Sequence, residues 1–335
     1  MNSQLSTFNS QLSFKVWVRC ATFNQAPYIT ATLDGFCRQQ TNFPYLCIIV
    51  DDDSKDGEQE VIRQYLTDHF TAENIEDTDD YHLTLARHQE NTNCFFAVYL
   101  LKYNHYSIKK PMKIHYQKMV SGVNYLAFCE GDDYWTDEHK LQKQADALDA
   151  NPHAMMVYTN FRIIDGENNP VSRPHIDKFP GRSHSGDNLP TLFRYGNYVM
   201  ALTTMYRSEV LQSDAFKKCS YSIDFATTLA AALMGDFIWL PEQTACYRSL
   251  GSGMVKSNLQ KGIRWSQDIY RYYAGLVING QCKPLSLAQR IHLTSLILMR
   301  ALKNKDHQLK KDVLRACPLS CLLLPIVFIK LKIDK

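Results

Sequence analysis

The sequence lacks the features that mark several common protein classes. Its ten cysteines form no C-x-x-C pair and no cysteine–histidine set with zinc-site spacing. It has no run of about 20 apolar residues, the length that spans a bilayer, and the nearest run, Cys317–Ile329, is short and contains two prolines. A formal net charge of only +3 provides no strong basic field for a nucleic acid. These absences argue against a zinc protein, a membrane-spanning protein and a nucleic-acid partner, and the scattered thiols favour a reduced, cytoplasmic protein.

The composition is that of a folded globular protein. The chain has 335 residues, of which 45% are hydrophobic and 21% charged. Residues 1–13 contain the near-duplicate NSQLSTF and NSQLSF without a basic or an apolar signal region, so we expect a frayed tail there rather than a signal peptide. We expect one main domain over residues 14–255, followed by a helical region over residues 256–335.

The first half of the chain alternates strand and helix patterns. The segment KVWVRC (Lys15–Cys20) and the apolar run YLCIIV (Tyr45–Val50) are typical of strands, whereas Tyr28–Gln40 and Glu58–Phe70 have helical spacing. This order predicts an open α/β fold in which a mostly parallel central sheet is flanked by helices.

Later segments extend this pattern less regularly. The polar stretch Thr71–Gln89, which contains EDTDDY, is predicted to be a solvated loop, and the loop over residues 165–190 is long enough to cover a site. Further strands and helices are predicted over Asp137–Ala150, Ala154–Phe161, Thr203–Val210, Tyr221–Leu233 and Phe237–Leu240, and from Leu259 onward the chain looks helical.

Acidic residues follow two of the predicted strands. The run ending at Val50 leads into DDDSKDG, and the run VNYLAF leads into CEGDDYW. In open α/β sheets, ligands bind outside the carboxyl ends of the strands. Both clusters therefore fall where a ligand would bind.

The second cluster has the chemistry of a cation site. Neighbouring carboxylates repel each other unless a cation compensates them, and oxygen ligands suit Mg²⁺ or Mn²⁺ held together with a substrate diphosphate. Glu130, Asp132 and Asp133 therefore indicate a site for a metal and a diphosphate, although on their own they fit the end of a strand and the cap of a helix equally well. An Asp after Val50 could accept a hydrogen bond from a nucleobase or ribose, so the two clusters together indicate a nucleotide site.

Three segments in this order resemble the family 2 glycosyltransferases with the GT-A fold, which are inverting enzymes often active in bacterial polysaccharide assembly. They are ATFNQAPYITATLDGFCRQQ, CIIVDDDSKDG, and YLAFCEGDDYWTDEHKLQKQADALDANPHAMMVYTNF. The resemblance covers roughly residues 14–250. It implies a Rossmann-like GT-A domain with a C-terminal helical extension, a nucleotide diphosphate sugar donor that is usually UDP-linked, and Mg²⁺ or Mn²⁺ as cofactor.

The resemblance also implies roles for individual residues. Thr22 and Asn24 belong to the first nucleotide loop, and Asp52 matches the carboxylate that faces the base. Asp132 corresponds to the ribose and donor-sugar side, and Asp133 to the metal ligand. Glu130 occupies the first position of the DxD-type motif, where Asp is more usual, so we assign it no direct metal bond and leave its role open.

An inverting transfer also needs a base to accept the proton of the acceptor hydroxyl. In SYSIDFATTLAAALMGDF, Asp224 opens a predicted helix at the position where the family places this base. The alternative is an ordinary helix N-cap, which Asp often provides.

Basic residues give weaker indications. Lys109 and Lys110 could neutralise phosphate or form a solvated face, and Arg248 could contact the diphosphate or acceptor or form a surface ion pair. The segment QKGIRW has one residue more than the Q-x-x-R-W motif of processive synthases, which favours a non-processive enzyme. The C-terminal LLLPIVFIKLK segment and nearby lysines could contact a membrane surface or pack on the domain.

The expected function is transfer of a sugar to a hydroxyl of a saccharide or lipid-linked saccharide in cell-surface polysaccharide synthesis. The expected location is the cytoplasm, or the inner face of the plasma membrane through peripheral contact. Two alternatives are weighed: a sugar-phosphate nucleotidyltransferase, and a non-catalytic membrane-surface scaffold with the same fold. A nucleotidyltransferase needs a Gly-rich basic loop after its first strand, and ATFNQAP has no glycine and no basic residue.

Overall fold

The computed structural model describes residues 13–120, 122–220, 224–250 and 259–324. In this part of the chain one ten-stranded sheet has the order β3-β4-β5-β2-β1-β6-β9-β8-β10-β7. The strands are β1 (Val16–Thr22), β2 (Tyr45–Asp51), β3 (Phe70–Asp77), β4 (Tyr81–His88), β5 (Cys94–Leu101), β6 (Tyr125–Phe128), β7 (Tyr134–Trp135), β8 (Ala154–Ile164), β9 (Thr204–Arg207) and β10 (Asp236–Arg248).

Helices cover both faces of this sheet. The α-helices are α2 (Ile29–Cys37), α3 (Glu58–His69), α4 (Lys113–Tyr116), α5 (Lys140–Ala150), α6 (Leu189–Tyr195), α7 (Glu209–Gln212), α8 (Asp214–Lys217), α9 (Asp224–Met234), α11 (Leu259–Ile278), α12 (Leu287–Lys303) and α13 (His307–Ala316). The 3₁₀ helices are η1 (Pro180–Arg182), η2 (Ala201–Thr203) and η3 (Pro318–Leu323).

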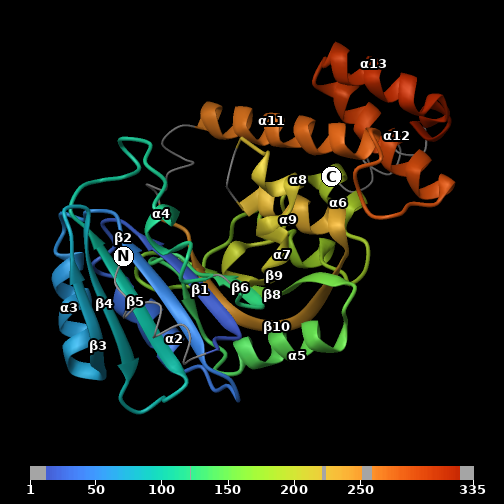
Figure 1. Cartoon of the computed structure of the whole chain (residues 1–335). Coiled ribbons are helices and arrows are strands. Elements are labelled where there is room, and N and C mark those ends of the chain that lie inside the picture. Colours follow the sequence, from blue (N-terminus) through green and yellow to red (C-terminus); the bar gives the residue numbers. More distant parts are fainter. Residues whose placement is uncertain (1–12, 121, 221–223, 251–258, 325–335) are drawn as a thin grey trace.

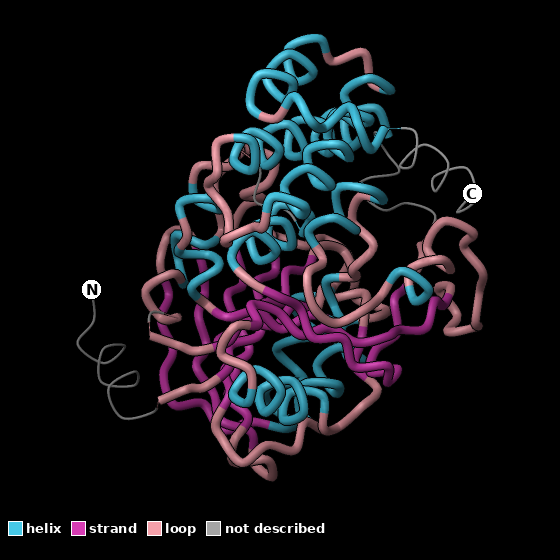
Figure 2. The backbone as a smooth tube through the Cα atoms, turned by 90° about the vertical axis from the view of Figure 1, so that its right-hand side faces the viewer, coloured by secondary structure: helices cyan, strands magenta, loops and turns pink. Residues whose placement is uncertain are grey.

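The centre of the sheet is parallel, as the sequence predicts. Strand β1 pairs in parallel with β2 and β6, and β2 pairs in parallel with β5. Every residue of β2 and β5 is buried, because α2 and α3 cover one face of this part of the sheet and α4 with the residues after it packs on the other. One hydrophobic core lies between the sheet and α2, α3 and α5. The other lies between the sheet and the helices of the second half of the chain (Figures 1 and 2).

The prediction of a loop over Thr71–Gln89 is wrong. Strands β3 and β4 pair there as an antiparallel hairpin, and β4 pairs with β5. The acidic segment EDTDDY is the end and turn of this hairpin. After its first position strand β3 has only exposed and half-buried residues, because it lies at the edge of the sheet. It therefore has no apolar run to mark it.

The C-terminal helices pack on α6 and α9, which cover the sheet's second face. Ile269 and Tyr273 of α11, and Leu293 and Ile297 of α12, belong to the same core as the strands, and α13 lies farthest out (Figure 1). No helix among the described residues has the length and apolarity needed to cross a membrane. The apolar segment proposed for membrane contact falls mainly in residues 325–335, which lie outside the described residues, as does the predicted N-terminal tail.

Candidate active site

The carboxyl ends of β1, β2 and β6 meet at one edge of the sheet, because these three strands run in parallel. Thr22 at the end of β1 is in register with Asp51 of β2, and Arg19 is in register with Phe128 of β6. The predicted nucleotide loops and the carboxylate turn that follows β6 therefore start from neighbouring strands.

Side chains hold the first two loops together. Glu58, buried at the start of α3, accepts hydrogen bonds from the Thr22 hydroxyl, from the backbone N–H of Gln25 (2.8 Å) and from the Ser54 hydroxyl (2.9 Å). Asn24 adopts a left-handed conformation with a φ of 54° and accepts from the N–H of Lys55 through its side-chain oxygen. Thr22 and Asn24 are thus brought to one place, but their side chains already have protein partners.

Asp52 lies at this edge but is enclosed. Its two carboxylate oxygens accept hydrogen bonds from the backbone N–H groups of His105 (2.6 Å) and Tyr106 (3.0 Å), and only 4% of the residue is exposed. In the structure Asp52 therefore holds the loop after β5. Its neighbour Asp51 is also buried, and one of its carboxylate oxygens has no hydrogen-bond partner.

The carboxylate turn, residues 130–133, packs directly on the first loop. The hydroxyl of Thr32 in α2 donates to the carbonyl oxygens of Gly131 (2.9 Å) and Asp133 (2.6 Å). A Cβ atom at Gly131 would lie 2.6 Å from the side-chain oxygen of Gln25, so only glycine allows this close approach. The turn is therefore fixed against α2 and the end of β1.

Burial raises the pKa values of all three carboxyl groups of the turn, and the charge of Asp132 adds to this effect at Glu130 and Asp133. Burial, with the charges of Asp224 and Asp132, raises the pKa of Glu130 to about 7 despite the opposing effect of Arg19. Burial and the neighbouring Asp132 raise the pKa of Asp133 well above its usual range. A divalent cation would relieve this repulsion, and the donors are oxygens, as Mg²⁺ and Mn²⁺ prefer.

The geometry does not supply a complete metal cage. Among the described residues, no group of three or more His, Cys, Asp or Glu side chains could hold a metal ion. A single carboxylate such as Asp133 fits a cation only if a substrate diphosphate supplies further ligands, which is a common arrangement for Mg²⁺.

Arg248 lies directly behind the turn. Its side chain donates to the carbonyl oxygens of Asp132 (2.9 Å) and Asp165 (2.8 Å) and to the side-chain oxygen of Asn168 (2.8 Å). Its backbone N–H donates to the carboxylate of Asp133 (2.7 Å), and only 3% of the residue is exposed. In the structure Arg248 therefore joins the turn to the loop that begins at Asp165.

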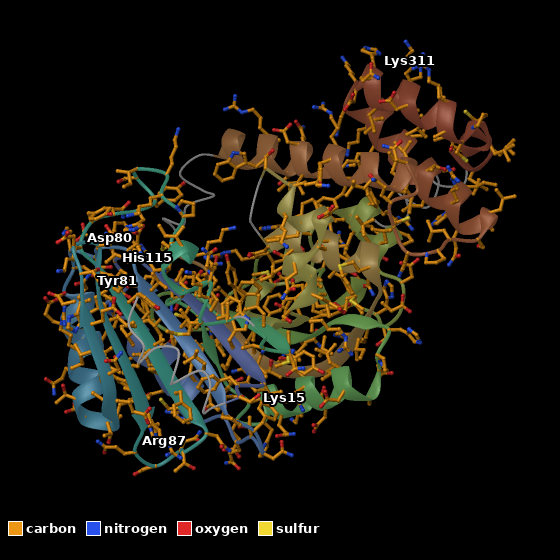
Figure 3. The ribbon with its side chains drawn as sticks, viewed as in Figure 1. Lys15, Asp80, Tyr81, Arg87, His115 and Lys311 are labelled. Carbon is orange, nitrogen blue, oxygen red and sulfur yellow. The ribbon has the colours of Figure 1, made fainter. Side chains whose placement is uncertain are left out.

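Lys109 and Lys110 lie on the loop after β5. Lys109 is exposed in a left-handed conformation with a φ of 59°. Lys110 forms an ion pair of 2.8 Å with Asp80 in the β3–β4 turn, and Asp80, Tyr81 and His115 gather at this edge of the sheet (Figure 3). Lys110 is thus engaged with the hairpin rather than with the carboxylate turn.

Asp224 is the first described residue of α9, as the sequence predicts for a helix start. The side chain is open to solvent, but the protein atoms crowded around it raise the pKa of its carboxyl group, and Arg19 opposes that effect. The residues that would show its cap geometry, 221–223, lie outside the described part.

Two residues of the site are absent from the sequence predictions. Arg19 is a charged residue inside the apolar segment KVWVRC, and Glu58 follows the DG turn at the start of a helix. The charge of Arg19 within a predicted central strand is a usable signal, since such a charge needs a partner. A local pattern does not reveal the partner, since Thr22, which donates to Glu58, is 36 residues away in sequence.

Relatives of this chain occur in mycobacteria. An uncharacterized protein of Mycobacterium tuberculosis is 29% identical over 240 residues, which cover 70% of this chain and 59% of that protein. A Mycobacterium bovis protein matches equally, so the chain spans about three fifths of the length of these relatives.

Solved structures with the same fold include S. aureus TarS. The crystal structure of its residues 1–349 in complex with UDP has a TM-score of 0.57 at 16% identity, and the match covers 96% of this chain and 88% of that chain. The complex of the same protein with UDP-GlcNAc has a TM-score of 0.56. This likeness shows the fold, which is that of the GT-A glycosyltransferases.

The family described as "Glycosyl transferase family 2" matches residues 18–95, which include most of β1, all of α2 and β2, and both loops of the predicted nucleotide site. This match covers part of the chain, and the described chain as a whole has the GT-A fold that glycosyltransferases share.

Proposed function

We propose that the protein is an inverting, metal-dependent glycosyltransferase. It moves a sugar from a nucleotide diphosphate sugar to a hydroxyl of a saccharide or lipid-linked saccharide in cell-surface polysaccharide synthesis. The observation that carries the proposal is that Asp224 and the carboxylate turn start from neighbouring elements: Thr228 ties the first turn of α9 to Tyr206 of β9, and β9 pairs with β6, which leads into the turn. An acceptor-side base and a diphosphate-side acidic group are the two parts that such a transfer requires.

A uridine nucleotide is the proposed donor. The loops after β1 and β2 provide the nucleotide end of the site, with Thr22, Asn24 and Asp52 as the proposed contacts and Asp132 toward the ribose. Contact through Asp52 would require its backbone partners to give way or to share its oxygens. The TarS structures, which contain UDP and UDP-GlcNAc, support the choice of uridine.

Asp133 is the proposed ligand for Mg²⁺ or Mn²⁺. The bound cation would supply positive charge to the diphosphate leaving group. Lys109 is exposed on a neighbouring loop and is the more available of the two lysines for a phosphate, because Lys110 is paired with Asp80.

Asp224 is the proposed general base. Its carboxylate would accept the proton of the acceptor hydroxyl while that oxygen forms a bond to the anomeric carbon and the bond from this carbon to the diphosphate oxygen breaks. A single displacement of this kind inverts the configuration at the anomeric carbon. The protein atoms around Asp224 raise the pKa of its carboxyl group, which favours proton uptake, as a base requires.

Membrane contact is proposed for the C-terminal end. Lys310 and Lys311 are exposed on α13, the outermost helix, where Figure 3 shows Lys311 at the rim. Such lysines would be attracted to anionic lipid, which suits a lipid-linked acceptor. The same helices pack on the catalytic core, so both roles proposed from the sequence are compatible.

The substitution Asp224→Asn tests this mechanism. We expect transfer, measured as UDP release from UDP-GlcNAc and a panel of UDP-, GDP- and dTDP-sugars, to fall by about 10²–10⁴-fold. Donor affinity should stay nearly unchanged, because Asp224 faces the acceptor. Asp214→Asn, at the exposed start of α8, is the matched control and should keep full activity.

The outcome also separates the alternatives. Unchanged transfer by Asp224→Asn would remove this mechanism. A wild-type protein that binds donors but releases no UDP with any acceptor would favour the scaffold, and formation of a nucleotide sugar from a sugar phosphate would favour the nucleotidyltransferase.

A further inference from the structure

A pocket of about 200 Å³ lies among the three C-terminal helices α11, α12 and α13. Its lining includes Tyr270 and Arg271 of α11, Arg300 of α12, and Asn304, Lys305 and Asp306 of the turn between α12 and α13. These helices lie on the far side of α6 and α9 from the sheet (Figure 1). The pocket is therefore separate from the carboxylate turn and the nucleotide loops.

The guanidinium of Arg300 is half-buried in this pocket without a carboxylate partner. Its carbon lies 4.3 Å from the ring centre of Tyr270. Within the described ranges its one hydrogen bond goes to the carbonyl oxygen of Phe193, at a long 3.5 Å, and it has no ion pair. A cation that is partly removed from water is stabilised by an anion nearby. Arg300 therefore has donors available for an anion.

Lys305 brings a second positive charge to the pocket. It follows α12 in a left-handed conformation with a φ of 56°, is exposed, and has no ion pair with the residues that the structure describes. The cap residue Asn304, also in the lining, carries an amide that can donate. The end of α12 thus presents three kinds of hydrogen-bond donor to one small pocket.

The carboxylate of Asp306 in the lining is already compensated. It pairs with Arg271 at 2.8 Å and caps α13 by accepting from a backbone N–H at 3.1 Å. The N-terminus of α13 adds partial positive charge there. Arg300 and Lys305 therefore leave the pocket with an excess of positive charge.

Tyr270 adds an unpaired donor. Only 3% of the residue is exposed, and its hydroxyl has no hydrogen-bond partner in the described part of the chain. Buried hydroxyls nearly always have a partner. An anionic oxygen beside Arg300 is the kind of partner that this hydroxyl lacks.

We propose that this pocket binds a phosphate group. A guanidinium fork and an ammonium group suit the oxygens of a phosphate. Pockets for whole small molecules measure about 300–1,000 Å³, so the smaller volume favours a phosphate group over an entire nucleotide. A lipid headgroup and a soluble phosphorylated saccharide share this chemistry. The site goes beyond the proposed function and does not depend on it.

Binding of inorganic phosphate to the full-length chain tests the site. A ³¹P NMR titration with EDTA present, at constant ionic strength, leaves the carboxylate turn without its cation. We expect Arg300→Met to weaken phosphate binding by about tenfold, because it removes charge-assisted hydrogen bonds. The exposed Lys305 contributes less, so Lys305→Met should weaken binding by about threefold. Lys303→Met, exposed on the same turn of α12 but outside the lining, is the charge-matched control and should bind as the wild type does.

Sedimentation with vesicles separates the two sources of phosphate. If the ligand is a lipid headgroup, phosphatidylcholine vesicles that contain phosphatidic acid should bind the wild type and Lys303→Met more strongly than Arg300→Met, and pure phosphatidylcholine should not distinguish them. If the ligand is soluble, the two variants should differ with inorganic phosphate and bind these vesicles equally.

Two results would overturn the proposal. One is a wild-type protein that binds neither inorganic phosphate nor the acidic vesicles. The other is equal binding of both probes by Arg300→Met and Lys303→Met. If circular dichroism shows that Arg300→Met is unfolded, Lys305→Met takes its place, and binding equal to that of Lys303→Met would again remove the site.

Discussion

At the scale of single residues, Arg248 shows how one side chain fixes the shape of the site. Its guanidinium is surrounded by oxygen acceptors from two loops and lies 4.4 Å from the ring centre of Tyr28. A planar fork of donors can serve several acceptors at once, which a lysine cannot do. The site therefore owes the position of Asp132 and Asp133 partly to a residue 115 positions further along the chain.

Arg248→Met tests this account. The substitution leaves buried carbonyl groups without donors, so we expect the free energy of unfolding to fall by about 2–4 kcal/mol and the donor KM to rise. Urea denaturation and initial-rate kinetics measure the two effects. Arg38→Met removes an exposed ion pair of α2 and should change stability by less than about 0.5 kcal/mol. Equal stability of the two variants would contradict the account.

The sequence predicts residue types better than their contacts. The Tyr-Arg pair that ends β10 identifies Arg248 as notable, but nothing in the local pattern reveals that its partners lie in the loop at Asp165. Likewise, the run of Asp after Val50 predicts an acidic strand end, whereas the two backbone donors that enclose Asp52 come from a loop about 50 residues later. Such contacts depend on the sheet order, which a local pattern does not contain.

At the scale of elements, α5 carries a buried lysine. Lys140 is fully buried, lies over the ring of Trp135 (4.3 Å) and donates to the side chain of Gln144 (2.7 Å). Burial lowers the pKa of Lys140 to about 7. In the folded protein the Lys140 side chain, which packs against the sheet, is therefore charged mainly below about pH 7.

Lys140→Met should therefore change how stability depends on pH. The unfolded lysine has a pKa near 10.4, so between about pH 7 and pH 10 the unfolded chain binds more protons than the folded chain. Linkage then makes the wild-type free energy of unfolding rise with pH over this range. We expect Lys140→Met to flatten this rise between pH 7 and pH 9 in urea titrations.

Lys143→Met, on the exposed side of the same helix, is the control and should keep the wild-type slope. A wild-type slope in Lys140→Met as well would show that the lysine stays protonated when folded. The substitution also removes the hydrogen bond to Gln144, which changes the free energy of unfolding at every pH. The measured quantity is therefore the slope of this free energy against pH and not its value.

Helices and strands can be predicted from the sequence where their buried residues form a regular apolar pattern. The parallel strands β1 and β2 and the helices α2, α3 and α5 agree with the predicted segments to within a few residues, because strands covered on both faces are apolar throughout. Strand β3 escapes prediction, since an edge strand needs few apolar residues. Strand β5, with all eight residues buried, has a clear apolar pattern that the sequence predictions leave unassigned.

At the scale of the whole molecule, the C-terminal helices are part of the hydrophobic core. Helices α11 and α12 pack against α9 and α6, and their apolar side chains join the core under the sheet. Removal of residues 259–335 should expose this face, so we expect the shortened chain to aggregate or to lose cooperative unfolding. Size-exclusion chromatography and thermal melts decide this. A monomer that melts cooperatively at the wild-type temperature would show that the helices are an independent appendage.

The central claim is that this fold holds a nucleotide diphosphate sugar together with a divalent cation at the carboxylate turn. The most direct measurement is the melting temperature of the full chain with Mn²⁺ and UDP-GlcNAc, or another UDP-, GDP- or dTDP-sugar, compared with Asp133→Asn. A donor present at 100 times its dissociation constant stabilises the folded state by about 2.7 kcal/mol, so we predict a rise of several degrees that needs Mn²⁺ and is lost in Asp133→Asn. No rise with any of these sugars, with or without Mn²⁺, would contradict the account.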